Sequence, residues 1–241
     1  MFLRLLPILT LPILTLLAAP AFADQPCLTA EALAKGIRVT VKDGSVQTFR
    51  AKGRDVQAVI PTGAFTAELL LARGLHVTRD HRTEHEPTPD PAPGEVMVGG
   101  NDGGTITTDY AYASLPKPGL DWAGTVKITR DQDGPSIGPQ PKVKGKVAAT
   151  VAFLPEETVK ISGCSYRIRP METVLSLAAD SRFTVGGEPQ VDLEEAAGKV
   201  LLSRRQIWFP DLGVAVITRE RGAETGWSDD WGQGIIGLAA E

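Results

Sequence analysis

Two strand-like runs separated by a tight turn, within residues 201–222 (LLSRRQIWFPDLGVAVITRERG), constrain the fold of this chain most strongly. The turn is residues 210–213, PDLG, in which the proline presets φ, the aspartate can hydrogen-bond its own backbone and the glycine can adopt a positive φ. The run after the turn, VAVI, is apolar on both faces, which is typical of a strand covered on both sides. This stretch therefore predicts a β-hairpin in a well-covered sheet.

Further hairpin signals lie on both sides of the chain's midpoint. Residues 37–41 alternate apolar and polar side chains, and Asp43-Gly44 then gives a short turn before residues 46–51. Residues 158–177 contain two more runs, with a bend at Ser162-Gly163. Short strands with turns between them and no alternation with helices predict a mainly antiparallel β protein. One or two short helices are expected, at residues 28–35 and 193–199.

The domain organisation follows from the two ends and one proline-rich stretch. Residues 1–23 carry one arginine, an apolar run and an Ala-Phe-Ala cleavage pattern, which predict a secretory signal peptide. Residues 24–222 are predicted to form a single β domain. Residues 87–94 (PTPDPAPG) interrupt it as a loop, since alternating prolines cannot donate to a sheet; a linker between two domains is the alternative. Residues 223–241 are expected to be a Gly- and Trp-containing tail.

A signal peptide places the mature protein in the periplasm or outside the cell. Two cysteines in an oxidising compartment predict a Cys27–Cys164 disulfide, with buried thiols or intermolecular pairing as alternatives. We expect no membrane span after signal cleavage. The net charge of −4 gives no electrostatic footprint for nucleic acid or anionic lipid. The sequence leaves the oligomeric state open.

All three histidines fall within ten residues, at His76, His81 and His85. Clustered imidazoles can bind Zn²⁺ or Cu²⁺, with neighbouring carboxylates as additional ligands. The spacing is not that of a standard site, and a solvated polar loop is the alternative. We assign no catalytic residue and expect no cofactor. The carboxylates that would complete such a metal site are Asp80, Glu84 and Glu86.

One part of the chain resembles a known superfamily. Residues 207–213 (IWFPDLG) and the preceding ETVKISGCSY of residues 157–166 are similar to bacterial exported β-domains of unknown function. Those domains resemble the periplasmic lipoprotein-carrier superfamily, and the resemblance covers residues 158–222. It implies a curved antiparallel sheet, wrapped as a half-barrel around an apolar cavity. A sandwich built from the same hairpins is the alternative.

Three functional hypotheses follow. The first is a non-enzymatic periplasmic protein that binds an apolar ligand or a cell-envelope protein on the concave face of its sheet. Tyr166, Trp208 and Phe209 are the candidate ligand-binding residues, and an ordinary core role is the alternative for each. The second hypothesis is a structural or assembly module without a small ligand. The third is a metal-dependent or carboxylate-based hydrolase.

Overall fold

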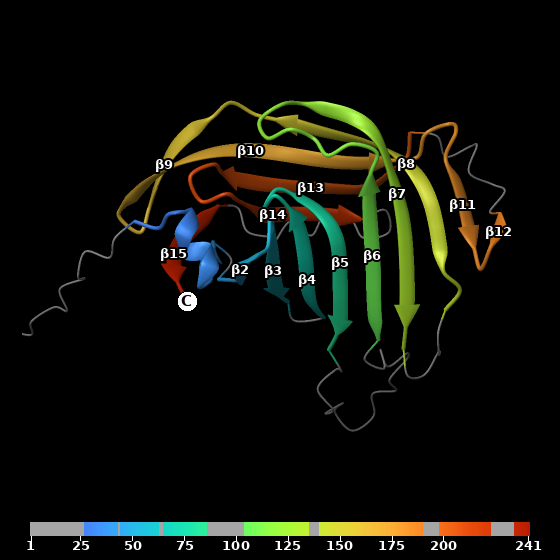
Figure 1. Ribbon diagram of the computed structural model, residues 1–241, viewed down its shortest axis with the longest axis horizontal. Coiled ribbons are helices and arrows are strands. Elements are labelled where there is room, and N and C mark those ends of the chain that lie inside the picture. The colour runs from blue at the N-terminus through green and yellow to red at the C-terminus, as the bar shows by residue number, and fades with distance from the viewer. Residues whose placement is uncertain are drawn as a thin grey trace, which may run out of the picture.

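The computed structural model describes residues 27–42, 44–62, 65–85, 104–134, 140–189, 198–222 and 234–241 (Figure 1). It contains one 3-10 helix, η1 (Ala30–Ala34), and fifteen strands. The strands are β1 (Ile37–Val41), β2 (Val46–Lys52), β3 (Asp55–Pro61), β4 (Phe65–Ala72), β5 (His76–Glu84), β6 (Thr105–Tyr112), β7 (Trp122–Asp133), β8 (Val143–Phe153), β9 (Glu157–Ile161), β10 (Cys164–Ser176), β11 (Arg182–Val185), β12 (Glu188–Pro189), β13 (Val200–Phe209), β14 (Val214–Gly222) and β15 (Ile235–Ala240).

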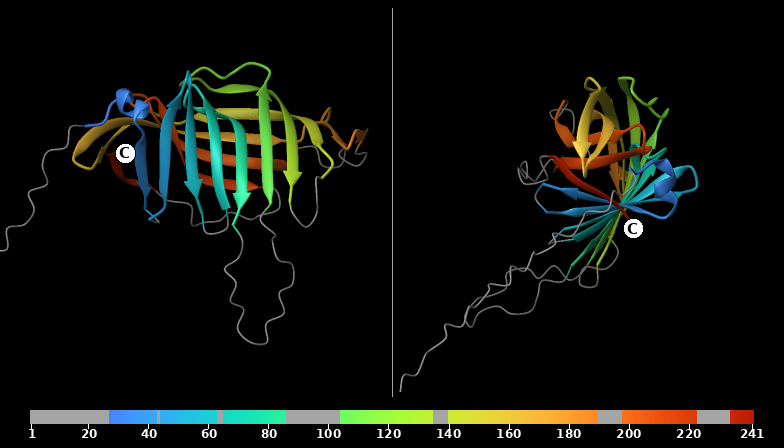
Figure 2. Two further views of the ribbon diagram at one scale, coloured as in Figure 1. Left: turned by 60° about the horizontal axis from the view of Figure 1, so that its bottom comes forward. Right: turned by 90° about the vertical axis from the view of Figure 1, so that its left-hand side faces the viewer.

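The described strands form one antiparallel sheet, and the predicted fold class is confirmed. Its order is β14-β13-β10-β8-β7-β6-β5-β4-β3-β2-β1-β15, with β9 attached to β10 and the β11–β12 hairpin attached to β8. The sheet curves so strongly that β10, β13 and β14 run across the strands β2–β7 as a second layer (Figures 1 and 2). Side chains between the two layers form the main core.

The three predicted hairpins are present. Phe209 pairs with Val214 across the PDLG turn, and Gly213 has the expected positive φ of 69°. The β1–β2 connection likewise has Gly44 at φ 88°. Residues 157–161 of β9 pair with residues 164–168 of β10. Each of these hairpins is a local structure, and turn chemistry was sufficient to predict it.

Other segments differ from the expectations. The polar segment at residues 76–85, for which a solvated loop was the alternative to a metal site, is mostly strand β5, which pairs with both β4 and β6. Part of the expected C-terminal tail is β15, which pairs with β1 and extends the sheet. The predicted signal peptide and the proline-rich loop at residues 87–94 lie outside the described residues, as does most of the predicted helix at 193–199.

The predicted disulfide between Cys27 and Cys164 is present, with a Cα–Cα distance of 5.6 Å. Next to it, the backbone N–H of Leu28 donates to the Tyr166 hydroxyl at 3.0 Å. These two contacts fasten the chain before η1 to the start of β10, 137 residues away in sequence. Among the described residues, no helix is long and apolar enough to cross a membrane.

The free edge of β14 is covered by the opposite layer. Gly74, in the β4–β5 turn, accepts a hydrogen bond at 2.7 Å from the backbone N–H of Ala215. The Gln47 side chain donates to the carbonyl oxygen of Ile217 at 2.6 Å, and the Gln206 side chain donates to that of Leu75 at 3.1 Å. Because an uncovered strand edge invites pairing with another chain, these bonds both join the layers and protect the edge.

Candidate functional site

Four charged side chains form a cluster between the two layers: Asp80 and Arg204, which are buried, and Glu220 and Arg82, which are partly buried. Arg82 lies 2.7 Å from Asp80 and 2.5 Å from Glu220, and Arg204 lies 2.7 Å from Glu220 and 3.5 Å from Asp80. The cluster contains two cations and two anions, so its charges balance. It therefore connects β5 to the β13–β14 hairpin without an uncompensated buried charge.

Glu220 keeps its charge at neutral pH. Burial raises the pKa of Glu220, but the attraction of Arg204 and Arg82 outweighs this effect and lowers the pKa to about 2. Burial raises the pKa of the adjacent Tyr110 to about 12, and Arg204 lies over its ring at 6.0 Å from the centroid. An acid that is ionised and fully paired is suited to holding two layers together, which favours a structural role for this cluster.

The three histidines do not converge. His76 Nε2 lies 3.2 Å from the carbonyl oxygen of Pro116, His81 Nδ1 lies 2.8 Å from the Thr107 hydroxyl and His85 Nε2 lies 2.9 Å from the Thr66 hydroxyl. A strand rises about 3.3 Å per residue, so His76 and His81 are about 16 Å apart along β5. Among the described residues, no group of three or more His, Cys, Asp or Glu side chains is placed to hold a metal ion. The predicted metal site is therefore not formed by this part of the chain.

His76 is buried and makes stability depend on pH. Burial lowers the pKa of His76 to about 4, with a contribution from the charge of Arg73, although the hydrogen bond to Pro116 opposes the shift. The unfolded chain therefore binds a proton at this residue as the pH falls through about 6.5, whereas the folded protein stays neutral until about pH 4. The stabilisation from neutral His76 is complete above pH 6.5 and is lost as the pH falls towards 4.

Lowering the pH from 6.5 to about 5 should reduce the unfolding free energy of the wild type by about 2 kcal/mol more than that of His76→Phe. Urea denaturation at a series of pH values measures both free energies. The two proteins having parallel pH profiles over this range would show that His76 does not titrate as its burial requires.

The three candidate ligand-binding residues lie on two faces of the second layer. Tyr166 and Phe209 are core residues with ring centroids 6.1 Å apart. Trp208 projects to the opposite face from Phe209, because adjacent strand residues alternate. On that face it pairs with Arg169 of β10. Tyr166 and Phe209 therefore fill the core, and Trp208 alone remains near the surface.

Trp208 belongs to an apolar surface patch that the sequence did not reveal. The Phe153 ring packs edge-on against Trp208 at 6.1 Å between centroids, and the Arg169 guanidinium lies over Phe153 at 5.3 Å from its centroid. Leu120 and Leu154, which directly follow Gly119 and Phe153 in sequence, are each 59% exposed. We call Leu120, Phe153, Leu154, Arg169 and Trp208 the Trp208 patch.

Two connections bring the patch together. Residues 113–121, between β6 and β7, arch over the top of the molecule (Figure 1). Asp121 in this connection accepts a hydrogen bond from the backbone N–H of Phe153 at 2.8 Å. A Cβ atom on Gly119 would lie only 2.6 Å from Arg169 Nη1 and 3.7 Å from the Trp208 ring. The backbone of the arch therefore lies directly against Arg169 and Trp208.

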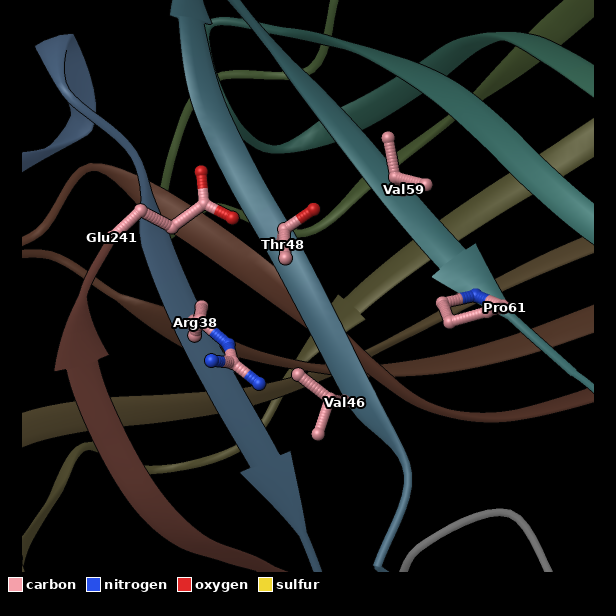
Figure 3. A pocket seen from close by; sticks show the side chains of 6 residues that line it. All are labelled: Arg38, Val46, Thr48, Val59, Pro61 and Glu241. Carbon is pink, nitrogen blue, oxygen red and sulfur yellow. The ribbon is translucent and has the colours of Figure 1, made fainter.

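A second candidate is an open groove of about 580 Å³ on the outside of the sheet (Figure 3). Side chains of β1, β2 and β3 line it together with Glu241, whose carboxylate pairs with the exposed Arg50 at 3.0 Å. Its apolar surface comes from Val46, Val59 and Pro61, and its charged groups are Arg38 and Glu241. The lining residues are Arg38, Val46, Thr48, Val59, Pro61 and Glu241. Neither site has a counterpart to compare: no family model, curated protein or solved structure matches this chain.

Sequence reasoning found Trp208 but missed its neighbours. Leu120 and Leu154 stand in the short connections SLPKPGLDW and FLPEE, among prolines and charged residues. A leucine in a short segment rich in proline, glycine and charged residues has no periodic core face to occupy, and this was the available signal. Their proximity to Trp208 depends on the pairing of β8 with β10 and of β10 with β13, which the sequence does not show.

Proposed function

We propose that this protein is an exported, non-enzymatic binding protein of the cell envelope, and that an apolar ligand or partner binds at the Trp208 patch. The observation that carries the proposal is the exposure of Leu120 and Leu154 on the two connections that meet near the half-buried Trp208. Contiguous exposed apolar side chains with a polar rim are typical of interaction sites rather than of ordinary surface.

Two further observations support export to the cell envelope. The Cys27–Cys164 disulfide is of the kind that persists in oxidising compartments. The N-terminal sequence has the pattern of a secretory signal. The cluster of charged side chains around Arg204 is paired internally, and this favours a structural role for the cluster over a catalytic one.

The proposal predicts that the purified mature protein binds an anionic apolar dye, 1-anilinonaphthalene-8-sulfonate, at the Trp208 patch. The double variant Leu120→Asp/Leu154→Asp should bind the dye about tenfold more weakly, because withdrawing even one leucine from apolar contact costs about 1.5 kcal/mol and 1.4 kcal/mol is a factor of ten. Fluorescence titration measures the dissociation constant.

Ile236→Asp is the matched control, since Ile236 is 58% exposed but lies on β15, away from the patch. This control should bind as wild type does. Equal binding by wild type and the double variant would contradict the proposal, and would favour the structural-module hypothesis instead.

A further inference from the structure

The groove in Figure 3 marks the place where aliphatic side chains interrupt the polar outward face of the sheet. Val59 pairs directly with Glu68 of β4, and the next residue in the same row is His81 of β5. Outward positions of an antiparallel sheet are ordinarily polar where water covers them. In the groove this row instead becomes aliphatic, and Val46 and Pro61 line the groove together with Val59. A concave surface with aliphatic side chains is suited to an apolar group.

Arg38 adds a cation without a partner to one side of this aliphatic surface. Its side chain is exposed, and within the described part of the chain it forms no ion pair. The carboxylate of Glu241, which also lines the groove, is already paired with Arg50 at 3.0 Å. In Figure 3 the Arg38 guanidinium points towards Val46 and not towards the Glu241 carboxylate. A guanidinium in this position can bind a carboxylate through two parallel N–H donors.

The dimensions of the groove limit the size of the ligand. Its volume of about 580 Å³ is typical of small-molecule sites. Because neighbouring strands lie about 4.8 Å apart, the distance from β1 to β3 is about 10 Å, which is the length of an aliphatic chain of about eight carbons. Glu68 stands three strands from Arg38, or about 14 Å, and accepts a hydrogen bond from the Gln57 side chain. An anion beside Arg38 is therefore distant from the acid on β4.

From these observations we infer that the groove is a binding site for a small aliphatic monocarboxylate of medium chain length. The carboxylate pairs with Arg38, and the chain lies over Val46, Val59 and Pro61. The groove shares no lining residue with the Trp208 patch, so this inference does not rest on the function proposed above. It gives the protein a second site, with an organic anion as its ligand.

The test is an ¹H–¹⁵N NMR titration of the purified full chain lacking residues 1–23 with octanoate. We expect the amide resonances of Thr48 and Val59 to shift and to saturate at millimolar octanoate. Acetate and octanamide, which lack the chain and the charge respectively, should each bind about fivefold more weakly or less. Arg38→Gln should weaken octanoate binding about fivefold and leave octanamide binding unchanged. Val46→Thr/Val59→Thr, which keeps the β-branched shapes, should weaken the binding of both ligands.

Arg54→Gln is the matched control, since Arg54 is also exposed but lies in the β2–β3 turn, outside the groove lining. This variant should bind octanoate as wild type does. Octanamide binding as tightly as octanoate would overturn the inference, and so would the lack of a saturable shift with octanoate. A tetrapeptide of leucine and valine with a free C-terminus is titrated in parallel. Saturable shifts of the Thr48 and Val59 amides with this peptide alone would identify a polypeptide as the occupant and contradict the small-molecule site.

Discussion

Gly74→Ala is expected to lower the unfolding free energy by about 3–5 kcal/mol, from the strain of a non-glycine residue at positive φ and from forced displacement of the backbone. Gly74 has φ 70°, and a Cβ atom there would lie 2.0 Å from the carbonyl oxygen of Gly213. The atom in the way belongs to the backbone of Gly213. The Gly74 backbone is also held in place, because its carbonyl oxygen accepts the bond from the Ala215 N–H. The turn of β4–β5 and the PDLG turn would have to separate. Urea denaturation measures the loss.

Gly53→Ala is the matched control for this substitution. Gly53 has a similar φ of 65°, but a Cβ atom on it would meet nothing within 4 Å. This variant should lose only the conformational part, about 1–2 kcal/mol. Losses of equal size in the two variants would show that the two turns do not approach as closely as described.

Arg204→Met is expected to lower the unfolding free energy by about 3–5 kcal/mol, because it leaves the buried Asp80 and Glu220 with only one cation between them. Arg204 is 3% exposed, so water does not replace the lost partner. Arg205→Met is the control on the same strand. The salt bridge from Arg205 to Glu172 is at the surface and should be worth about 1 kcal/mol or less.

The double variant Arg204→Met/Glu220→Met distinguishes a charge effect from a packing effect. Removing both members of the pair leaves Asp80 with Arg82, so the remaining charges balance again. The double variant should therefore be more stable than Arg204→Met alone. A double variant that is less stable than the single one would show that the uncompensated charge of Glu220 is not the cause of the loss in Arg204→Met.

The same cluster predicts a loss of stability in acid. The pKa of Glu220 is lowered in the folded protein, so its stabilisation is complete above the ordinary pKa of 4.5 and is lost as the pH falls towards 2. This range lies mostly below that of His76. Arg204→Met removes the largest attraction that lowers this pKa, so its stability should depend less on pH in that range.

The sequence predicted those parts of the fold that depend on neighbouring residues. The PDLG turn, the β1–β2 hairpin and the β9–β10 hairpin are specified by residues within a few positions of one another. The polar strand β5 was missed because its side chains gain partners only from distant elements: Asp80 and Arg82 require Arg204 and Glu220 from the other layer. β15 was missed because its partner, β1, lies nearly the whole length of the described chain away.

The candidate site, like the fold, could be predicted only in part from the sequence. Aromatic character indicated Tyr166, Trp208 and Phe209, but the choice between core and surface depended on strand alternation and on which face the second layer covers. Pro170 lies where β10 changes its pairing partner: β9 pairs as far as Ile168 and β8 pairs from Met171. This change of partner brings the end of β8, with Phe153 and Leu154, next to Trp208.

The most direct test of binding at the Trp208 patch is ¹⁹F NMR of the mature protein labelled with 5-fluorotryptophan. The Trp208 resonance is assigned by its absence in Trp208→Phe, and the anionic dye is then titrated into the wild type. We predict that the Trp208 resonance shifts or broadens as the dye binds, and that it does not do so in Leu120→Asp/Leu154→Asp. Dye binding that leaves the Trp208 resonance of the wild type unchanged would place the apolar site elsewhere and contradict the proposed function.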